Sequence, residues 1–193
     1  MVALCNRSGE HLLNLIDEVL DVAKIEAGRV IVENALFEVS ALVRDTVEMV
    51  RARPRAKSIE LLVNRSSNVP SFACSDAAKL RQMLLNLIGN TVKFTEEDSV
   101  ILRADAEPID AGQRLLLIFE VQDTGIGIAP EDHARIFVLF VRVNKPDTQN
   151  GIGLGLSIAW HFVQMMGGPF VWTARRADQA SRPLIRSDGS SPK

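Results

Sequence analysis

Apolar residues recur at steps of three and four in several stretches of the chain, which predicts amphipathic helices. The first is expected from about 9 to 27, with Ser8 as its N-cap and Gly28 as its C-terminal stop. A second is expected from Ser40 to about Arg51. The face of the first helix is wide enough to need a partner helix, in the same chain or another. Its apolar positions are Leu12, Leu13, Leu15, Ile16, Val19, Leu20, Val22 and Ala23.

The clearest helical pattern starts at Asp76, a favourable N-cap, and continues to about Phe94. A short helix is expected over 131–140. Another is expected from Gly155 to about Met166, ended by Gly167–Gly168. The apolar face of the helix after Asp76 contains Leu80, Met83, Leu84, Leu87, Ile88 and Thr91.

Extended stretches between the helices predict strands. Two of them, 100–106 and 115–122, are joined across Asp110–Ala111–Gly112 and predict an antiparallel hairpin. Helices and strands mix without strict alternation, so we expect an α+β fold, a two-layer sandwich with helices on one face of a mixed sheet. The other expected extended stretches are 30–37, 59–63, 71–74 and 169–173.

Composition narrows the class of protein. The 193 residues are 47% hydrophobic with a net charge of -2, which fits one main domain plus an appendage and gives no reason to expect nucleic acid as a partner. Cys5 and Cys74 fit no metal or redox spacing, and no apolar run approaches the roughly 20 residues that span a bilayer. We therefore expect a cytoplasmic segment, whose parent protein could be anchored elsewhere. Residues 175–193 combine arginines and serines with few large apolar residues, which predicts a disordered tail.

The helix after Asp76 also carries candidate chemistry. At about 100° per residue, Asn86, Asn90 and Lys93 fall within roughly 60° of one another, away from the apolar face. An amide oxygen is a suitable Mg²⁺ ligand, and a lysine can neutralise phosphates. The alternative is an ordinary solvated helix face.

Two glycine-rich loops follow. In 123–128, of pattern D-x-G-x-G, Asp123 could accept a hydrogen bond from an exocyclic amine such as that of adenine, and the alternative is a tight turn with an exposed aspartate. The second loop, 151–156, opens a helix, and free amides at a helix N-terminus bind anions. It matches neither the dinucleotide fingerprint nor the P-loop.

These three motifs, in this order, resemble the ATP-binding fold shared by histidine kinases, GyrB-type topoisomerases, Hsp90-type chaperones and MutL, the GHKL superfamily. Residues 80–95 look specifically like the histidine kinase N box, and 136–142 like its F box. Residues 20–28 resemble the end of the second dimerisation helix of these kinases. The resemblance implies part of a dimerisation domain over 1–29 and an ATP-binding catalytic domain over 30–174.

The resemblance also implies roles for individual residues. Asn90 would bind Mg²⁺, Asn86 would support the metal and phosphates, and these two with Lys93 form the catalytic group. Asp123 would bind the adenine amine, with Gly127 giving room. Residues 141–150 would form a lid over ATP. The further implied nucleotide-site residues are Phe94, Gly125, Ile128, Phe140, Arg142, Gly151, Gly153, Leu154, Gly155 and Leu156.

One sequence position distinguishes the ATP-hydrolysing branches of this superfamily from the histidine kinases. Where the ATP-hydrolysing branches carry a glutamate as general base, this chain has Asn86, and an amide is no base near pH 7. The resemblance therefore implies phosphoryl transfer from ATP, leaving ADP, to a histidine of a dimerisation domain, for relay to the receiver domain of a response regulator. A homodimer through the first helix is possible.

Two departures from the family pattern leave alternatives open. None of His11, His133 and His161 lies in an acceptor motif, so the acceptor is expected outside this chain. The F box carries Val138–Leu139 where the family commonly has Glu-Pro. A catalytically degenerate ATP-binding signalling module and a related serine kinase or ATPase are the alternatives.

Overall fold

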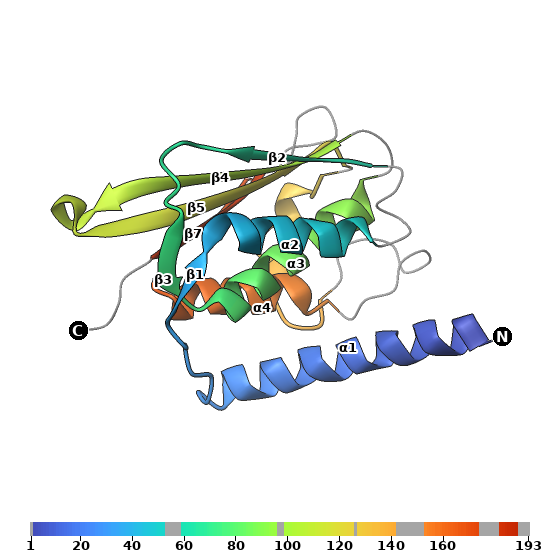
Figure 1. The fold of residues 1–193 in the computed structure, drawn as a ribbon. Coiled ribbons are helices and arrows are strands. Elements are labelled where there is room, and N and C mark those ends of the chain that lie inside the picture. Colours follow the sequence, from blue (N-terminus) through green and yellow to red (C-terminus); the bar gives the residue numbers. More distant parts are fainter. Residues whose placement is uncertain are drawn as a thin grey trace.

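The computed structural model describes residues 2–52, 59–95, 99–125, 127–141, 153–173 and 182–188. They form a two-layer sandwich in which α2 (Val39–Arg51), α3 (Ala77–Phe94) and α4 (Gly155–Met165) cover one face of a sheet, as Figure 1 shows. The N-terminal helix α1 (Val2–Glu26) extends beside this sandwich. The expected α+β sandwich is confirmed.

In the described parts of the chain the main sheet has five strands in the order β2-β4-β5-β7-β6, with β2 parallel to β4 and the other pairs antiparallel. The expected hairpin is present, and Val100 pairs with Asp123 at its open end. A separate two-stranded sheet pairs β1 with β3. The strands are β1 (Ala35–Glu38), β2 (Glu60–Arg65), β3 (Phe72–Ser75), β4 (Ser99–Ile109), β5 (Arg114–Asp123), β6 (Phe170–Thr173) and β7 (Arg182–Asp188).

Strand β7 corrects the expectation of a disordered tail. Residues 182–188 lie inside the main sheet, where Ile185 pairs with Phe119 of β5 on one side and Phe170 of β6 on the other. A strand paired on both sides satisfies its backbone hydrogen-bonding groups whatever its composition, so the arginines and serines of this segment did not exclude it. The rest of the expected tail lies outside the described residues.

Local boundaries differ in two other places. Helix α1 begins at Val2 and passes through Ser8, so Ser8 is no N-cap. The helix expected over 131–140 is instead two 3₁₀ turns, Pro130–Asp132 and Arg135–Phe137. Val138 has extended backbone and ends the second turn, so the predicted longer helix does not form.

The core lies between the sheet and the helix layer. Helix α3 is its centre, and the expected apolar face is buried, with Leu80, Met83, Leu84 and Ile88 fully enclosed. The core contacts from the sheet and from α4 include Val100, Leu102, Phe119, Val121 and Ile158. This packing fixes α3, and with it the opposite face of the helix, which carries the candidate polar residues.

The start of α3 is fixed by Asp76, the N-cap expected from the sequence. The side chain of Asp76 is buried and accepts hydrogen bonds from the backbone nitrogens of Lys79 and Glu33, both at 3.0 Å. The ammonium nitrogen of Lys79 lies 2.6 Å from Asp76 Oδ2 and donates to the carbonyl of Ile31 at 2.7 Å. Asp76 and Lys79 therefore tie the segment after α1 to the start of α3.

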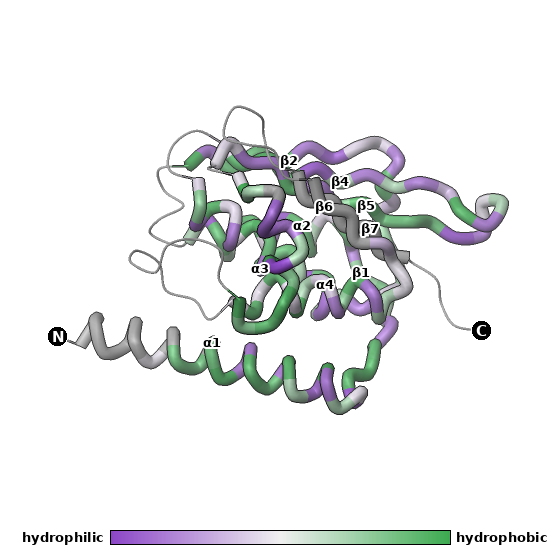
Figure 2. The backbone as a smooth tube through the Cα atoms, turned by 180° about the vertical axis from the view of Figure 1, so that it is seen from behind, coloured by the Kyte–Doolittle hydropathy of each residue, from purple (hydrophilic) through white to green (hydrophobic). Residues whose placement is uncertain are grey.

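Helix α1 keeps much of its apolar face uncovered. Figure 2 shows hydrophobic residues recurring along α1 on the outside of the sandwich. Val22 is buried, whereas Leu12, Leu13, Ile16, Val19 and Leu20 are exposed. Among the described residues, no helix has the length and hydropathy of a membrane span.

Candidate functional site

The polar face of α3 meets the first residue of α4. The Nδ2 atom of Asn86 donates a hydrogen bond to the carbonyl oxygen of Gly155 at 3.1 Å. A Cβ atom placed on Gly155 would lie 3.5 Å from Nδ2 of Asn90 and 3.6 Å from Cγ of Asn86. Both asparagines are half-buried, so this part of the helix face is not fully solvated. The structure thus brings the candidate metal-binding amides to the second glycine loop.

Within the described part of the chain, no side chain caps the N-terminus of α4. Leu154 precedes the helix without a capping hydrogen bond, and its carbonyl accepts from the backbone nitrogen of Ile158 at 2.9 Å. First-turn backbone N–H groups and the helix dipole of such an end attract anions. The start of α4, beside Asn86 and Asn90, therefore has the chemistry of a phosphate site.

Gly153 shapes the approach to that helix end. Its φ of +79° lies in the left-handed region, and a Cβ there would lie 2.6 Å from the carbonyl oxygen of Val141. The backbone of the F box at Phe140 and Val141 therefore packs directly on Gly153, and only glycine fits without a shift. Leu154 is buried and Leu156 half-buried against the core, so Leu154 can serve a ligand only through its backbone.

Asp123 ends β5 at the other candidate loop. Its Oδ1 atom accepts a hydrogen bond from the backbone nitrogen of Gly125 at 2.8 Å. The side chain is half-buried, and burial raises the pKa of the Asp123 carboxyl, an effect that the bond from Gly125 partly offsets. Asp123 and Gly125 thus form a local turn, and the aspartate in it is half-buried rather than exposed as the alternative expected.

Gly125 brings this loop onto the end of α3. A Cβ on Gly125 would lie 2.7 Å from the carbonyl oxygen of Phe94 and 2.9 Å from Oδ1 of Asp123. The ammonium of Lys93 lies 5.3 Å from the ring centroid of Phe94, within range of a cation–π contact. The end of α3 therefore places Lys93 and Phe94 beside the turn that holds Asp123.

The remaining candidates have different surroundings. Gly127 has a φ of +69°, which favours glycine, and Ile128 is half-buried. Phe140 also has a left-handed φ, of 64°, and its side chain is largely exposed, so its backbone rather than its ring packs near Gly153. Arg142 and Gly151 lie outside the described residues.

Two contacts near the site had no signal in the sequence. The Nε2 atom of His133 lies 3.1 Å from the carbonyl oxygen of Ile128, so this histidine holds the D-x-G-x-G loop to the following turn. The Nδ1 atom of His161 lies 2.7 Å from the carbonyl oxygen of Ser157 within α4. Both histidines are half-buried and engaged with backbone, which is a structural use of the side chain.

Comparisons with known proteins agree with this geometry. The sequence model of a family described as histidine kinase-, DNA gyrase B-, and HSP90-like ATPase matches residues 75–188. The sensor protein GacS of Pseudomonas syringae pv. syringae is 35% identical over 164 residues, which cover 84% of this chain and 18% of that protein. The sensory/regulatory protein RpfC of Xanthomonas campestris pv. campestris is 36% identical over 163 residues, covering 83% and 22%.

A solved structure extends the similarity to the whole chain. The crystal structure of full-length ShkA in complex with AMPPNP has a TM-score of 0.80 and 34% identity, over 100% of this chain and 39% of that one. This chain therefore spans well under half of ShkA and about a fifth of the two sensor proteins, at 18% and 22%.

Proposed function

This chain belongs to the family of histidine kinase-, DNA gyrase B- and HSP90-like ATPases, and from that premise we propose that it is the ATP-binding catalytic part of a sensor histidine kinase. The observation that carries the proposal is the hydrogen bond of Asn86 to Gly155, which puts two amide side chains beside an uncapped helix N-terminus. The similar structure of ShkA is a complex with AMPPNP, an ATP analogue. Residues 30–188 would be the catalytic domain, and α1 part of a dimerisation domain.

The residues present fit Mg-ATP. The phosphates would lie against the amides that open α4, beside Asn86 and Asn90, with Lys93 neutralising charge. The amide oxygen of Asn90 would ligate Mg²⁺, which supplies charge neutralisation of the transferred phosphoryl group. Asp123, held by the turn at Gly125, would accept a hydrogen bond from the adenine amine.

The proposed reaction is the transfer of the γ-phosphoryl group of ATP to the acceptor histidine. A ring nitrogen of the acceptor histidine forms a bond to the γ-phosphorus, the bond from that phosphorus to the β,γ-bridging oxygen breaks, ADP leaves, and the imidazole loses its proton. The protein contributes mainly positioning and charge stabilisation to such a transfer. Asn86 supplies no general base for water, which favours transfer to a side chain over hydrolysis.

The partners follow from the same proposal. The acceptor histidine would be on a dimerisation domain, from which a response regulator receiver domain takes the phosphoryl group. Of the three histidines of this chain, His133 and His161 contact backbone carbonyls, which does not suit an acceptor. The exposed apolar face of α1 would cover the partner helix of such a domain, within one chain or in a homodimer.

Labelled ATP tests this function. The chain should not label itself, but it should label an added dimerisation domain that carries an acceptor histidine, with an acid-labile, base-stable product. Asn90→Ala should abolish the transfer. Label on this chain alone, or wild-type transfer by Asn90→Ala, would contradict the proposal.

A further inference from the structure

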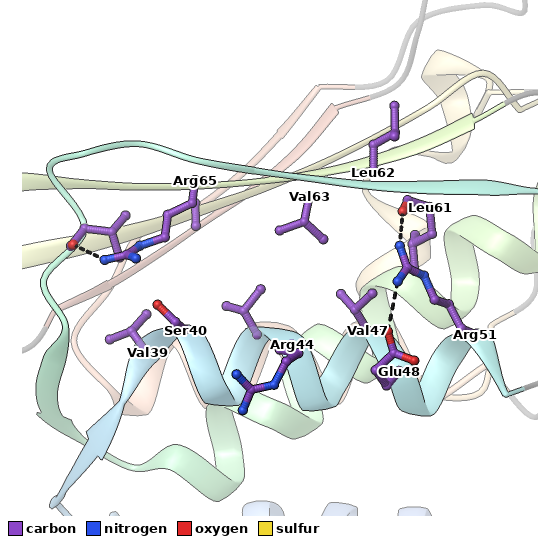
Figure 3. A pocket seen from close by; sticks show the side chains of 13 residues that line it. Val39, Ser40, Arg44, Val47, Glu48, Arg51, Leu61, Leu62, Val63 and Arg65 are labelled. Atoms are coloured by element: carbon purple, nitrogen blue, oxygen red, sulfur yellow. Dashed lines mark hydrogen bonds and ion pairs between the residues drawn. The ribbon is translucent and has the colours of Figure 1, made fainter.

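A groove separate from the candidate nucleotide site runs between α2 and the edge strand β2 (Figure 3). Its volume is about 490 Å³. Helix α3 lies between α2 and α4, so the groove and the phosphate-type site are on opposite sides of α3. The lining residues that matter here are Val43, Arg44, Val47, Leu61, Val63 and Arg65.

The floor of the groove is apolar and incompletely covered. Val43 and Val47 of α2 are buried, yet Val63 on β2 is 40% exposed. Figure 3 shows Val63 and Val47 pointing toward one another across the space between strand and helix. Val63 therefore leaves apolar surface at the floor of the groove that a further segment can cover.

One wall of the groove is the free edge of the sheet. Among the strands that the structure describes, β2 pairs only with β4, so its other side is an edge of the described sheet. The carbonyl of Leu61 faces this edge, because the guanidinium of Arg51 reaches across from α2 and donates to it at 2.7 Å. Alternate residues of a paired strand present their backbone groups to the same side, so Val63 also directs its N–H and C=O outward. No described residue binds them.

The rim of the groove is basic. Arg44, Arg51 and Arg65 line it, in a chain whose net charge is -2. Glu48, the one acidic residue in the lining, pairs with Arg51 at 2.9 Å, so Arg44 and Arg65 make the rim basic. Arg44 is 65% exposed, and its ion-pair partner Asp45 is not among the lining residues. In Figure 3 Arg65 and Arg51 lie toward the two ends of the groove, with Arg44 between them on the helix.

We propose that the groove between α2 and β2 binds an extended acidic peptide segment of a partner protein, which adds a strand to the edge of β2. The backbone of the segment would pair with the outward groups of Val63, which is how β-augmentation gains affinity. Every second side chain of the segment would face α2. Apolar side chains among these would fill the space against Val43 and Val47, and carboxylates among them would meet Arg44 and Arg65, which supplies specificity.

Three synthetic peptides test the proposal. The probes are a fluorescein-labelled eight-residue peptide with serine at every second position and valine and glutamate taking turns at the others, a copy with lysine in place of glutamate, and a copy of the first with proline at its centre. Fluorescence anisotropy should show the glutamate peptide binding at least about tenfold more tightly than the lysine peptide. The proline copy should lose binding, because proline removes a backbone donor. Amide resonances of Val63 and Arg44 should shift with the glutamate peptide.

Variants of the protein give the matching test. Arg44→Glu should weaken binding of the glutamate peptide about tenfold and strengthen binding of the lysine peptide. Arg29 is an exposed arginine outside the groove, so Arg29→Glu should leave both affinities unchanged. Val63→Pro should abolish binding. If that variant does not fold, Arg44→Glu and the proline peptide still decide the question.

Several results would overturn the proposal. They are equal binding of the glutamate and lysine peptides, undiminished binding of the proline copy, and absence of amide shifts at Val63. A concentration-dependent dimer that Arg44→Glu dissolves would assign the groove to a second copy of this chain instead. Because the assay contains no nucleotide, its outcome is independent of the proposed kinase function.

Discussion

The side-chain nitrogen Nδ2 of Asn86 lies 3.1 Å from the carbonyl oxygen of Gly155, although the two residues are 69 positions apart in the chain. This bond joins the middle of α3 to the first residue of α4. It places the half-buried Asn86 and Asn90 at the helix end whose backbone amides are uncapped. The candidate nucleotide site depends on this junction.

Replacing Asn86 by alanine should loosen the junction. We expect Asn86→Ala to lower the free energy of unfolding by about 0.5–1.5 kcal/mol, the usual net value of one hydrogen bond, and to weaken nucleotide binding as well. Urea denaturation and calorimetry measure the two effects. Asn68→Ala is the matched control, because Asn68 is exposed and bonds only weakly to Asp105, at 3.3 Å. If the two variants had the same stability and the same nucleotide affinity, Asn86 would not belong to the site.

Gly125 should tolerate no side chain. In Gly125→Ala the new Cβ would meet the carbonyl oxygen of Phe94 at 2.7 Å, so either the loop at Gly125 or the end of α3 must shift. This shift should lower the free energy of unfolding by about 1–3 kcal/mol. Nucleotide affinity should fall with it, because the same loop holds Asp123. Gly9→Ala is the control. Its Cβ meets nothing within 4 Å on α1, and alanine favours a helix, so affinity should not change. Unchanged affinity in Gly125→Ala would contradict the geometry of this loop.

The raised pKa of Asp123 predicts a pH dependence of binding. Burial raises this pKa above that of an ordinary aspartate, so the carboxylate takes up its proton at a higher pH than in the unfolded chain. The adenine-accepting form should therefore be lost as pH falls through the raised pKa. The same shift has the opposite sign for folding. Its contribution to stability is present below the unfolded pKa and lost as pH rises through the folded one.

Calorimetry of nucleotide binding over a pH series measures the binding effect. Asp123→Asn should bind more weakly near neutral pH, by about 1–3 kcal/mol, and should not show the loss of affinity at low pH. Circular dichroism at each pH checks that the protein is folded. An identical pH profile in wild type and Asp123→Asn would show that Asp123 does not contact the nucleotide.

Asp76 should make a large contribution to stability. Its buried carboxylate accepts bonds from Lys79 and from the backbone of Glu33, so Asp76→Asn leaves the Lys79 ammonium, 16% exposed, without its counter-ion. We expect a loss of about 1.5–3 kcal/mol in urea denaturation. Asp45→Asn removes an exposed ion pair with Arg44 and should cost at most about 1 kcal/mol. Similar losses in the two variants would contradict this account of Asp76.

The same carboxylate predicts how stability changes with pH. Burial alone would raise the pKa of Asp76, but the bonds from Lys79 and Glu33 outweigh it and lower the pKa below the usual value. The contribution of Asp76 is therefore complete above the unfolded pKa and is lost as pH falls through the folded one. The difference in stability between wild type and Asp76→Asn should shrink over that acidic range.

The parts of the fold that local patterns determine were predictable from the sequence. Asp76 as the N-cap of α3, and the hairpin of β4 and β5, follow from capping chemistry and from alternation within a few residues. Strand β7 was missed because its formation depends on neighbours on both sides of the sheet rather than on its own residues. The bond from Lys79 to the carbonyl of Ile31 spans 48 positions and likewise has no local signal.

Some features of the candidate site were likewise predictable from local sequence, and others were not. Helical spacing predicted that Asn86 and Asn90 share one face, and the structure confirms that this face meets the second glycine loop. Spacing gave no information on the exposed ring of Phe140, because helical spacing does not predict the left-handed backbone that this residue adopts. The half-burial of Asp123, which sets its pKa, likewise results from tertiary packing.

We propose that this chain binds Mg-ATP at the junction of α3 and α4. Isothermal calorimetry with the ATP analogue AMPPNP, with and without Mg²⁺, tests it most directly, using Asn90→Ala as the variant and Asn68→Ala as the control. We predict saturable binding that strengthens with Mg²⁺ in wild type and in Asn68→Ala, and that loses its Mg²⁺ dependence in Asn90→Ala. Absence of binding by the folded wild-type protein at millimolar nucleotide, or the same Mg²⁺ dependence in Asn90→Ala, would contradict the claim.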